Sequence, residues 1–343
     1  MEKEEILHLS FNHEKDLLTM GTSSGFKVFR LYPLELIHKE LMGNFKIVEA
    51  YESSHLLALV GAGELPAYSP RRLTIYNLQE RTPICETAFQ DTILAVRSNR
   101  LRIVAVLADS IYIYDTTTMK TQKTIHTVHN PLGLAALSPS HSSCYLIYPA
   151  SEERGHLQIF DCFNMYMCNE VAAHKSPLAA VSINSEGTMC ASASEKGTVI
   201  RVFSVPEAQK LFTFKRGMMN AQTYDLSFSL ESDSVVSCSD TGTIHVYNLS
   251  REVEVTNSWG SMLRSSIYNA ASYIVPSSYR DSFETSRSYI VARTGFTGKY
   301  IAILRNELLV ALAFDGKFKE FKVDLSREGE AGLQNEGNLS EII

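Results

Sequence analysis

The sequence has a single tryptophan, no Cys-x-x-Cys pair and no long apolar run. The apolar stretches, such as 103–108, are far too short to span a bilayer, and the charged residues 1–5 do not resemble a signal peptide. The cysteines are widely scattered, which indicates neither a zinc site nor a disulfide framework. We interpret them as free thiols of a cytoplasmic protein; they are Cys85, Cys144, Cys162, Cys168, Cys190 and Cys238.

An excess of positive charge is also missing. The formal net charge is -6 over 343 residues, whereas counterion-driven binding to nucleic acid requires a basic face. We therefore expect no nucleic-acid partner, and any anion binding must be local. The sequence also lacks Gly-x-Ser-x-Gly, His-Glu-x-x-His and a P-loop, and Gly61-Ala62-Gly63 lacks the rest of a dinucleotide fingerprint. We expect no enzyme, no metal site and no cofactor.

What the sequence does contain is a short strand pattern that recurs along its length and ends in an aromatic anchor. The gaps between anchors are 47, 38, 46, 43, 44 and 74 residues, and five of the six fit the spacing of roughly 40–45 residues of four-stranded propeller blades. The anchors are Phe29, Tyr76, Tyr114, Phe160, Phe203, Tyr247 and Phe321.

This period predicts an all-β fold, a seven-bladed β-propeller with a long insertion in the sixth blade. We expect one propeller over 1–325, an insertion over about 251–290 and a polar C-terminal segment over 326–343. The Trp-Asp dipeptide of many such repeats is absent, so the repeat is divergent. A pair of stacked β-sandwich domains is the alternative.

Two adjacent cations, Lys215 and Arg216, stand at the end of a strand-like run. If 211–216 is a strand, the two side chains point to opposite faces of one sheet edge and suggest two anion sites. The position two residues before the anchor holds Arg201 and His245 in the flanking blades, although Lys27 also occupies it elsewhere. A solvated turn is the alternative interpretation.

Taken as a whole, the chain resembles the PROPPIN family, the WIPI-type β-propellers that bind phosphoinositides in autophagy. The resemblance covers nearly the whole chain and is densest over 173–180, 191–204 and 209–217. The family signature is Phe or Leu, Arg, Arg, Gly, and here it reads Phe214-Lys215-Arg216-Gly217. The change matters because arginine offers a planar fork to phosphate, whereas lysine is a point charge.

The resemblance implies two headgroup pockets and a role as an effector or scaffold in autophagosome formation. Their ligand would be phosphatidylinositol 3-phosphate and/or phosphatidylinositol 3,5-bisphosphate, on preautophagosomal and endosomal membranes. By resemblance, the first pocket consists of His174, Ser192, Thr198, Arg201 and Lys215, and the second of Arg216, Ser239, Thr241, Thr243 and His245. Ammonium, guanidinium and hydroxyl groups suit a phosphomonoester.

The long sixth gap predicts an amphipathic helix that contacts the membrane. Its apolar positions follow helical spacing over 259–275, a cation lies among the intervening positions, and Pro276 marks the end. The predicted contacts are Trp259, Leu263, Arg264, Ile267 and Ile274. Family members insert a long loop of this blade into bilayers. A loop that packs on itself is the alternative.

A propeller that serves only as a protein-interaction scaffold is the competing function. The resemblance also implies recruitment of a component of the autophagy lipid-conjugation machinery through basic residues near the second and third blades. Candidates are Arg97, Arg100 and Arg102, and Thr117 stands where WIPI-type relatives can carry arginine.

Overall fold

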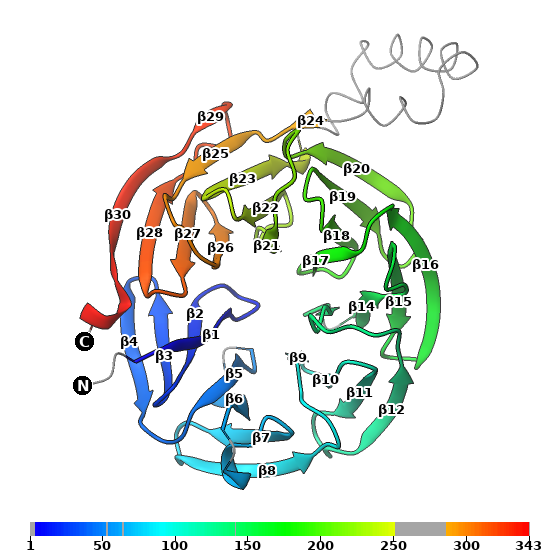
Figure 1. Ribbon diagram of the computed structural model, residues 1–343, viewed down its shortest axis with the longest axis vertical. Coiled ribbons are helices and arrows are strands. Elements are labelled where there is room, and N and C mark those ends of the chain that lie inside the picture. The colour runs from blue at the N-terminus through cyan, green and yellow to red at the C-terminus, as the bar shows by residue number, and fades with distance from the viewer. Residues whose placement is uncertain (1–3, 53, 64, 141, 251–285, 343) are drawn as a thin grey trace.

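Seven β-sheets stand in a ring around a central axis, as Figure 1 shows for the computed structural model. The structure describes residues 4–52, 54–63, 65–140, 142–250 and 286–342. We call each sheet a blade and number the blades in chain order. The predicted seven-bladed, all-β propeller is confirmed.

The strands follow one another outward from the axis in each blade. Blade 1 contains β1 (Ile6–Phe11), β2 (Leu17–Thr22), β3 (Gly25–Leu31) and β4 (Leu34–Glu40). Blade 2 contains β5 (Phe45–Ala50), β6 (Leu56–Gly61), β7 (Arg72–Asn77) and β8 (Thr82–Ala88), with the 3₁₀ helix η1 (Pro66–Tyr68) between β6 and β7. Blade 3 contains β9 (Ala95–Ser98), β10 (Arg102–Val106), β11 (Ser110–Asp115) and β12 (Thr121–His126).

In the second half of the ring, blades 5 and 6 each contain a fifth strand, and blades 4 and 7 contain four. Blade 4 contains β13 (Ala136–Leu137), β14 (Tyr145–Pro149), β15 (Gly155–Asp161) and β16 (Tyr166–His174). Blade 5 contains β17 (Leu178–Ile183), β18 (Met189–Ser194), β19 (Val199–Ser204), β20 (Lys210–Lys215) and β24 (Ser286–Arg287). Blade 6 contains β21 (Thr223–Phe228), β22 (Ser234–Ser239), β23 (Thr243–Asn248), β25 (Ile290–Arg293) and β29 (Gly329–Glu330). Blade 7 contains β26 (Tyr300–Arg305), β27 (Leu308–Ala313), β28 (Lys317–Lys322) and β30 (Gly332–Asn338), followed by the 3₁₀ helix η2 (Leu339–Glu341).

The aromatic anchors all lie on the third strand of a blade, which is why their spacing predicts the ring. The second strands differ: β18 and β22 are almost wholly buried and read Met-Cys-Ala-Ser-Ala-Ser and Ser-Val-Val-Ser-Cys-Ser. A strand covered on both faces needs small or apolar side chains throughout rather than an alternating pattern.

Each pair of neighbouring blades shares one hydrophobic cluster. Ile200, Val202 and Phe214 of blade 5 pack against Tyr247 of blade 6, for example. Blades 1 and 7 meet in the same way, with Leu18 and Phe29 packed against Val310 and Leu339. Among the described strands none passes between blades 1 and 7, so side-chain packing closes the ring there.

The C-terminal segment corrects the predicted domain boundary. Residues 326–343 were expected to lie outside the propeller, but β29 pairs in parallel with β25, and β30 completes blade 7 by pairing with β28. The residues of β30 are polar and mostly exposed, because an outermost strand is held by backbone hydrogen bonds and needs little apolar surface. Its sequence therefore lacks the alternation by which strands are recognised.

The predicted insertion begins after β23, and residues 251–285 lie outside the described part. The chain returns at β24, which pairs in parallel with the outer strand β20 of blade 5, and then enters blade 6 as β25. Within the described residues, no helix is both long and apolar enough to cross a bilayer.

Candidate anion-binding site

Lys215 and Arg216 lie where β20 ends in blade 5, and Lys215 pairs with Arg287 of the short outermost strand β24. Lys215 is the last residue of β20 and pairs with Val199 of β19. Arg201, two residues after Val199, pairs with Thr213, so Lys215 and Arg201 share one face of the sheet. Arg216 follows the strand, and its backbone N–H donates to the carbonyl of Thr198 at 2.9 Å.

The face that carries Arg201 is turned toward blade 4. Arg201 Nη1 donates to the carbonyl of Ala173 at 2.8 Å and lies 3.3 Å from Nδ1 of His174. Nε2 of His174 lies 3.0 Å from the hydroxyl oxygen of Ser192, which pairs with Arg201 in the neighbouring strand. Three of the residues proposed for the first pocket, Arg201, His174 and Ser192, are therefore in direct contact.

The remaining members of the first pocket lie at its rim. Lys215 is half-buried, and no hydrogen bond or ion pair of its ammonium group occurs within the described part of the chain. Thr198 immediately precedes Val199, the residue paired with Lys215. Thr213 was not among the predicted residues, yet it lies opposite Arg201, and its buried hydroxyl has no partner among the described residues. The signal available in the sequence is its position two residues before Lys215 on the same strand face.

Arg216 begins the second group of residues, between blades 5 and 6. Its Nε donates to the carbonyl of Gly197 at 2.5 Å, and its Nη2 donates to the carbonyl of Met219 at 2.6 Å. Both acceptors are neutral, and within the described residues no carboxylate is paired with Arg216. Since a guanidinium has five N–H donors, three remain for a ligand, and the full charge is retained.

The acceptor Gly197 is a position that only glycine fits. Its φ is +58°, and a Cβ there would lie 1.8 Å from the carbonyl oxygen of Ala221. Left-handed backbone and close approach together require glycine. The Lys196-Gly197 turn thereby supports the Arg216 side chain.

His245 lies on the face of blade 6 that is turned toward blade 5. It precedes Tyr247, whose ring stacks on Phe214 of blade 5 with centroids 4.7 Å apart. Nδ1 of His245 lies 3.1 Å from the hydroxyl oxygen of Ser288, a residue that the sequence analysis assigned to the insertion over about 251–290 and not to the site. The pairing of β23 with β25 brings it there.

The three hydroxyl residues proposed for the second pocket cluster on one turn. The hydroxyl oxygens of Ser239 and Thr241 lie 2.9 Å apart, and Thr243 follows two residues later, with its hydroxyl 3.4 Å from the Thr241 carbonyl. The phenol oxygen of Tyr300 in blade 7 lies 2.9 Å from the Ser239 carbonyl and 3.1 Å from the Thr243 carbonyl, so its single O–H is shared between these two acceptors. This buried phenol therefore holds the backbone of the turn in place through its carbonyls.

The pKa values of the two histidines are lowered by the same two causes. Burial and, secondly, the Arg201 guanidinium lower the pKa of His174 to about 4. Burial and, secondly, the Arg216 guanidinium lower the pKa of His245 to about 4. Each half of the site therefore combines a permanent cation with a neutral imidazole at neutral pH, and an incoming anion would favour protonation of the imidazole.

The predicted membrane-contact residues lie outside the described residues; they are Trp259, Leu263, Arg264, Ile267 and Ile274. The basic residues considered for a protein partner are described and are engaged. Arg97 pairs with Glu49 at 2.9 Å, and Arg102 pairs with Asp115 at 3.3 Å. Arg100 pairs with Glu52 at 2.8 Å, but its side chain remains 60% exposed.

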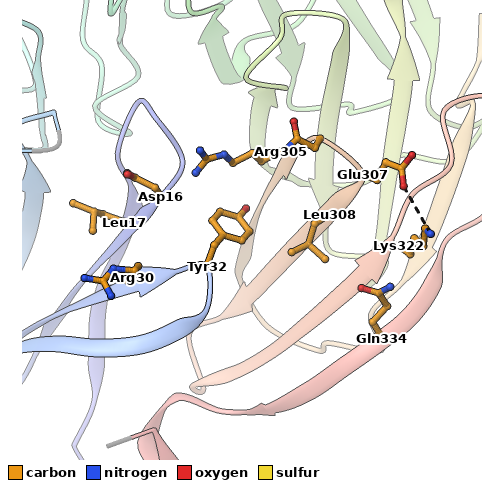
Figure 2. Close-up of a pocket in the computed structure, with 10 residues that line it drawn as sticks. Asp16, Leu17, Arg30, Tyr32, Arg305, Glu307, Leu308, Lys322 and Gln334 are labelled. Carbon is orange, nitrogen blue, oxygen red and sulfur yellow. Dashed lines mark ion pairs between the residues drawn. The ribbon is translucent and has the colours of Figure 1, made fainter.

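A separate hollow of about 690 Å³ lies between blades 1 and 7 (Figure 2). The Arg305 guanidinium lies over the ring of Tyr32, 5.1 Å from its centroid, and burial raises the pKa of this phenol to about 12. The central channel forms a hollow of about 890 Å³. Neither hollow is lined by Lys215 or Arg216.

Sequence relatives match this chain over nearly its full length. The chain matches the PROPPIN family over residues 6–333. It is 33% identical to Autophagy-related protein 18 of Yarrowia lipolytica, over 99% of this chain and 98% of that protein. It is 34% identical to WD repeat domain phosphoinositide-interacting protein 2 of Mus musculus, over 98% of this chain and 77% of that protein.

Solved structures show the same fold. Kluyveromyces lactis Hsv2 with its complete loop 6CD superposes with a TM-score of 0.79 at 17% identity, covering 98% of this chain and 100% of that one. KlAtg21, solved as a complex with the coiled-coil of AgAtg16, gives 0.78 at 20% identity, covering 97% and 99%. With a family match across nearly the whole chain and relatives about one third identical over its full length, the chain belongs to the PROPPIN family.

Proposed function

We propose that this chain binds the 3-phosphorylated inositol headgroup of phosphatidylinositol 3-phosphate and/or phosphatidylinositol 3,5-bisphosphate. In this proposal it acts as a peripheral effector in autophagosome formation, on preautophagosomal and endosomal membranes. The observation that carries it is the placement of Lys215 and Arg216. They are adjacent in the chain, and neither is neutralised by an ion pair among the described residues. Lys215 shares a sheet face with Arg201, which contacts the buried His174. The Arg216 guanidinium lies close enough to the partly buried His245 to lower its pKa.

The chemistry of both groups suits a phosphomonoester. Each offers a cation, a hydroxyl and an imidazole that is neutral until an anion arrives. Charge-assisted hydrogen bonds to phosphate are short and strong, and arginine can make two of them at once. The name of the mouse relative, WD repeat domain phosphoinositide-interacting protein 2, is consistent with this proposal.

The proposal is tested by vesicle flotation with and without phosphatidylinositol 3-phosphate. Losing one charge-assisted hydrogen bond costs about 1.5–3 kcal/mol, so Arg216→Ala should weaken binding about ten- to one-hundred-fold. Lys215→Ala should weaken it less, because lysine makes a single point contact. If Lys215→Ala abolishes binding and Arg216→Ala does not, the two pockets are assigned wrongly.

A matched control separates a specific site from general charge. Lys322→Ala removes one cation from blade 7, two blades around the ring from blade 5; this side chain is 61% exposed and lies 3.8 Å from Glu307. It should bind like wild type. Equal loss in Lys322→Ala and Arg216→Ala would show that only net charge matters and would contradict the proposal, as would equal binding to unphosphorylated phosphatidylinositol.

A role as a protein scaffold is compatible with lipid binding. The structure of KlAtg21 with an AgAtg16 coiled-coil concerns a protein of the same fold. In this chain Arg100, whose side chain is 60% exposed at the junction of blades 2 and 3, is the residue we propose for contact with a component of the lipid-conjugation machinery. Pull-down of such a coiled-coil by wild type but not by Arg100→Glu tests it.

A further inference from the structure

Two methionines form the most exposed apolar feature of the described residues. Met218 and Met219 are 87% and 82% exposed, more than any other large hydrophobic side chain in that part of the chain. They follow Arg216 and Gly217 directly and precede Asn220, so the tip carries no charge of its own. We call residues 217–220 the methionine tip.

The tip has fixed ends. At its start, the N–H groups of Arg216 and Gly217 donate to the Thr198 carbonyl, at 2.9 and 3.4 Å. At its end, the N–H of Ala221 donates to the Lys196 carbonyl at 3.1 Å, and Ala221 is buried. The turn at 195–198 therefore anchors both ends of the tip by backbone hydrogen bonds, while the two methionine side chains remain exposed.

The tip is also joined to the proposed headgroup site. Nη2 of Arg216 donates to the carbonyl of Met219 at 2.6 Å, while Nε of the same guanidinium donates to Gly197. One side chain therefore fixes both the cation offered to a phosphate and the position of Met219. When Arg216 binds a lipid headgroup, the tip is therefore placed next to the membrane surface that carries this headgroup.

We propose that Met218 and Met219 enter the lipid interface beside the bound headgroup and supply apolar contact that the two pockets cannot. This inference rests on the proposed function. The occupant is a bilayer because two cations without ion-pair partners in the described chain, Lys215 and Arg216, adjoin the tip and complement an anionic surface. Exposed Lys196 extends that charge. Unbranched, polarizable methionine suits an irregular apolar environment.

The test compares Met218→Ser/Met219→Ser with wild type on phosphatidylcholine/phosphatidylserine vesicles containing phosphatidylinositol 3-phosphate. Removing the apolar surface of two side chains should lower partition at least about tenfold. Met167→Ser is the control, since Met167 is 51% exposed near the start of β16, at the opposite end of that strand from His174. It should partition like wild type.

A second measurement separates the two proposals. The water-soluble headgroup, inositol 1,3-bisphosphate, should bind the double serine variant as tightly as wild type, because the backbone that Arg216 contacts is unchanged. If wild type binds neither this headgroup nor the vesicles, the proposed function is wrong. If the headgroup binds and the serine pair partitions like wild type, the tip inference is wrong.

The depth of the methionine tip in the bilayer can be measured with the variant Met218→Cys, labelled with an environment-sensitive dye. The emission should shift to the blue on vesicles and stay unchanged with soluble headgroup. Wild type taken through the same labelling corrects for Cys85 and Cys168, which are partly exposed. A dye that remains in water on protein-loaded vesicles would overturn the inference and leave the tip to a protein contact.

Discussion

Arg201 fixes the tautomer of His174. Because a guanidinium only donates, Nδ1 of His174 must accept at the 3.3 Å contact, which leaves the imidazole proton on Nε2, directed to Ser192 at 3.0 Å. Protonation at Nδ1 therefore requires Arg201 to leave. A dianion that attracts Arg201 provides that opportunity, so anion binding and proton uptake are linked at this pocket.

This linkage predicts that affinity depends on pH. In the free protein the pKa of His174 and of His245 is lowered to about 4, so both are neutral at pH 7. A bound phosphate raises both values, so protons are taken up on binding, and affinity for phosphatidylinositol 3-phosphate should rise from about pH 7.5 to about pH 6.

The control for the pH dependence is the variant His174→Gln/His245→Gln. It keeps hydrogen-bonding groups but cannot titrate, so its affinity should follow only the ionisation of the phosphate itself, whose second pKa is about 6. Fluorescence titration of soluble headgroup across pH measures both slopes. Identical slopes for the variant and wild type would show that neither histidine takes up a proton.

Lys215→Arg should tighten binding to vesicles that contain phosphatidylinositol 3-phosphate. The substitution restores the Arg-Arg pair of the family signature and offers a planar fork where lysine offers a point charge. One additional hydrogen bond to a charged group predicts a gain of about tenfold. An unchanged titration would mean that this position does not touch phosphate.

Gly197→Ala should destabilise the fold and weaken headgroup binding together. Alanine at φ +58° costs about 1–3 kcal/mol in backbone strain, and its Cβ would also collide with the Ala221 carbonyl. The displaced turn carries the carbonyl that holds Arg216. Chemical denaturation and headgroup titration measure the two effects.

Gly217→Ala is the matched control for that variant. No atom lies within 4 Å of a Cβ built at Gly217, so stability should change little. A large loss of stability in Gly217→Ala, or none in Gly197→Ala, would contradict the role assigned to the turn.

Leu339→Ala should destabilise the ring although it lies in the segment that the sequence suggested was outside it. Leu339 is 2% exposed in the cluster between blades 1 and 7, and a buried Leu→Ala change costs about 2–5 kcal/mol. Leu333→Ala, at a side chain that is 50% exposed, should change the free energy of unfolding by no more than about 0.5 kcal/mol. Equal values for the two variants would place Leu339 outside the core.

Much of the fold could be predicted because buried aromatics recur at the same strand position. Phe29 and Tyr247 are 0% exposed on third strands, where no polar residue could replace them without losing the packing between blades. β30 could not be predicted, because an outermost strand held by backbone hydrogen bonds leaves no apolar pattern. Periodicity in the sequence therefore predicts a strand only where burial restricts which side chains the strand can carry.

The candidate site was predictable to a similar degree. Alternation along a strand separates Lys215 from Arg216, and the register of β19 and β20 places Lys215 on the face of Arg201. The bonds from Arg216 to the Gly197 and Met219 carbonyls depend on turn geometry, which spacing does not encode. Ser288 beside His245 depends on where the chain re-enters after the insertion.

The parallel pairings of β24 with β20 and of β29 with β25 make some junctions between blades stronger than others. Residues 286–293 link blade 5 to blade 6 by hydrogen bonds, and residues 329–338 link blade 6 to blade 7. Blades 1 and 7 are held by side-chain packing, with no described strand between them. On heating or under mechanical load, the ring should open first between blades 1 and 7. The amide hydrogens of blades 5, 6 and 7, which are joined by strand pairing, should exchange last.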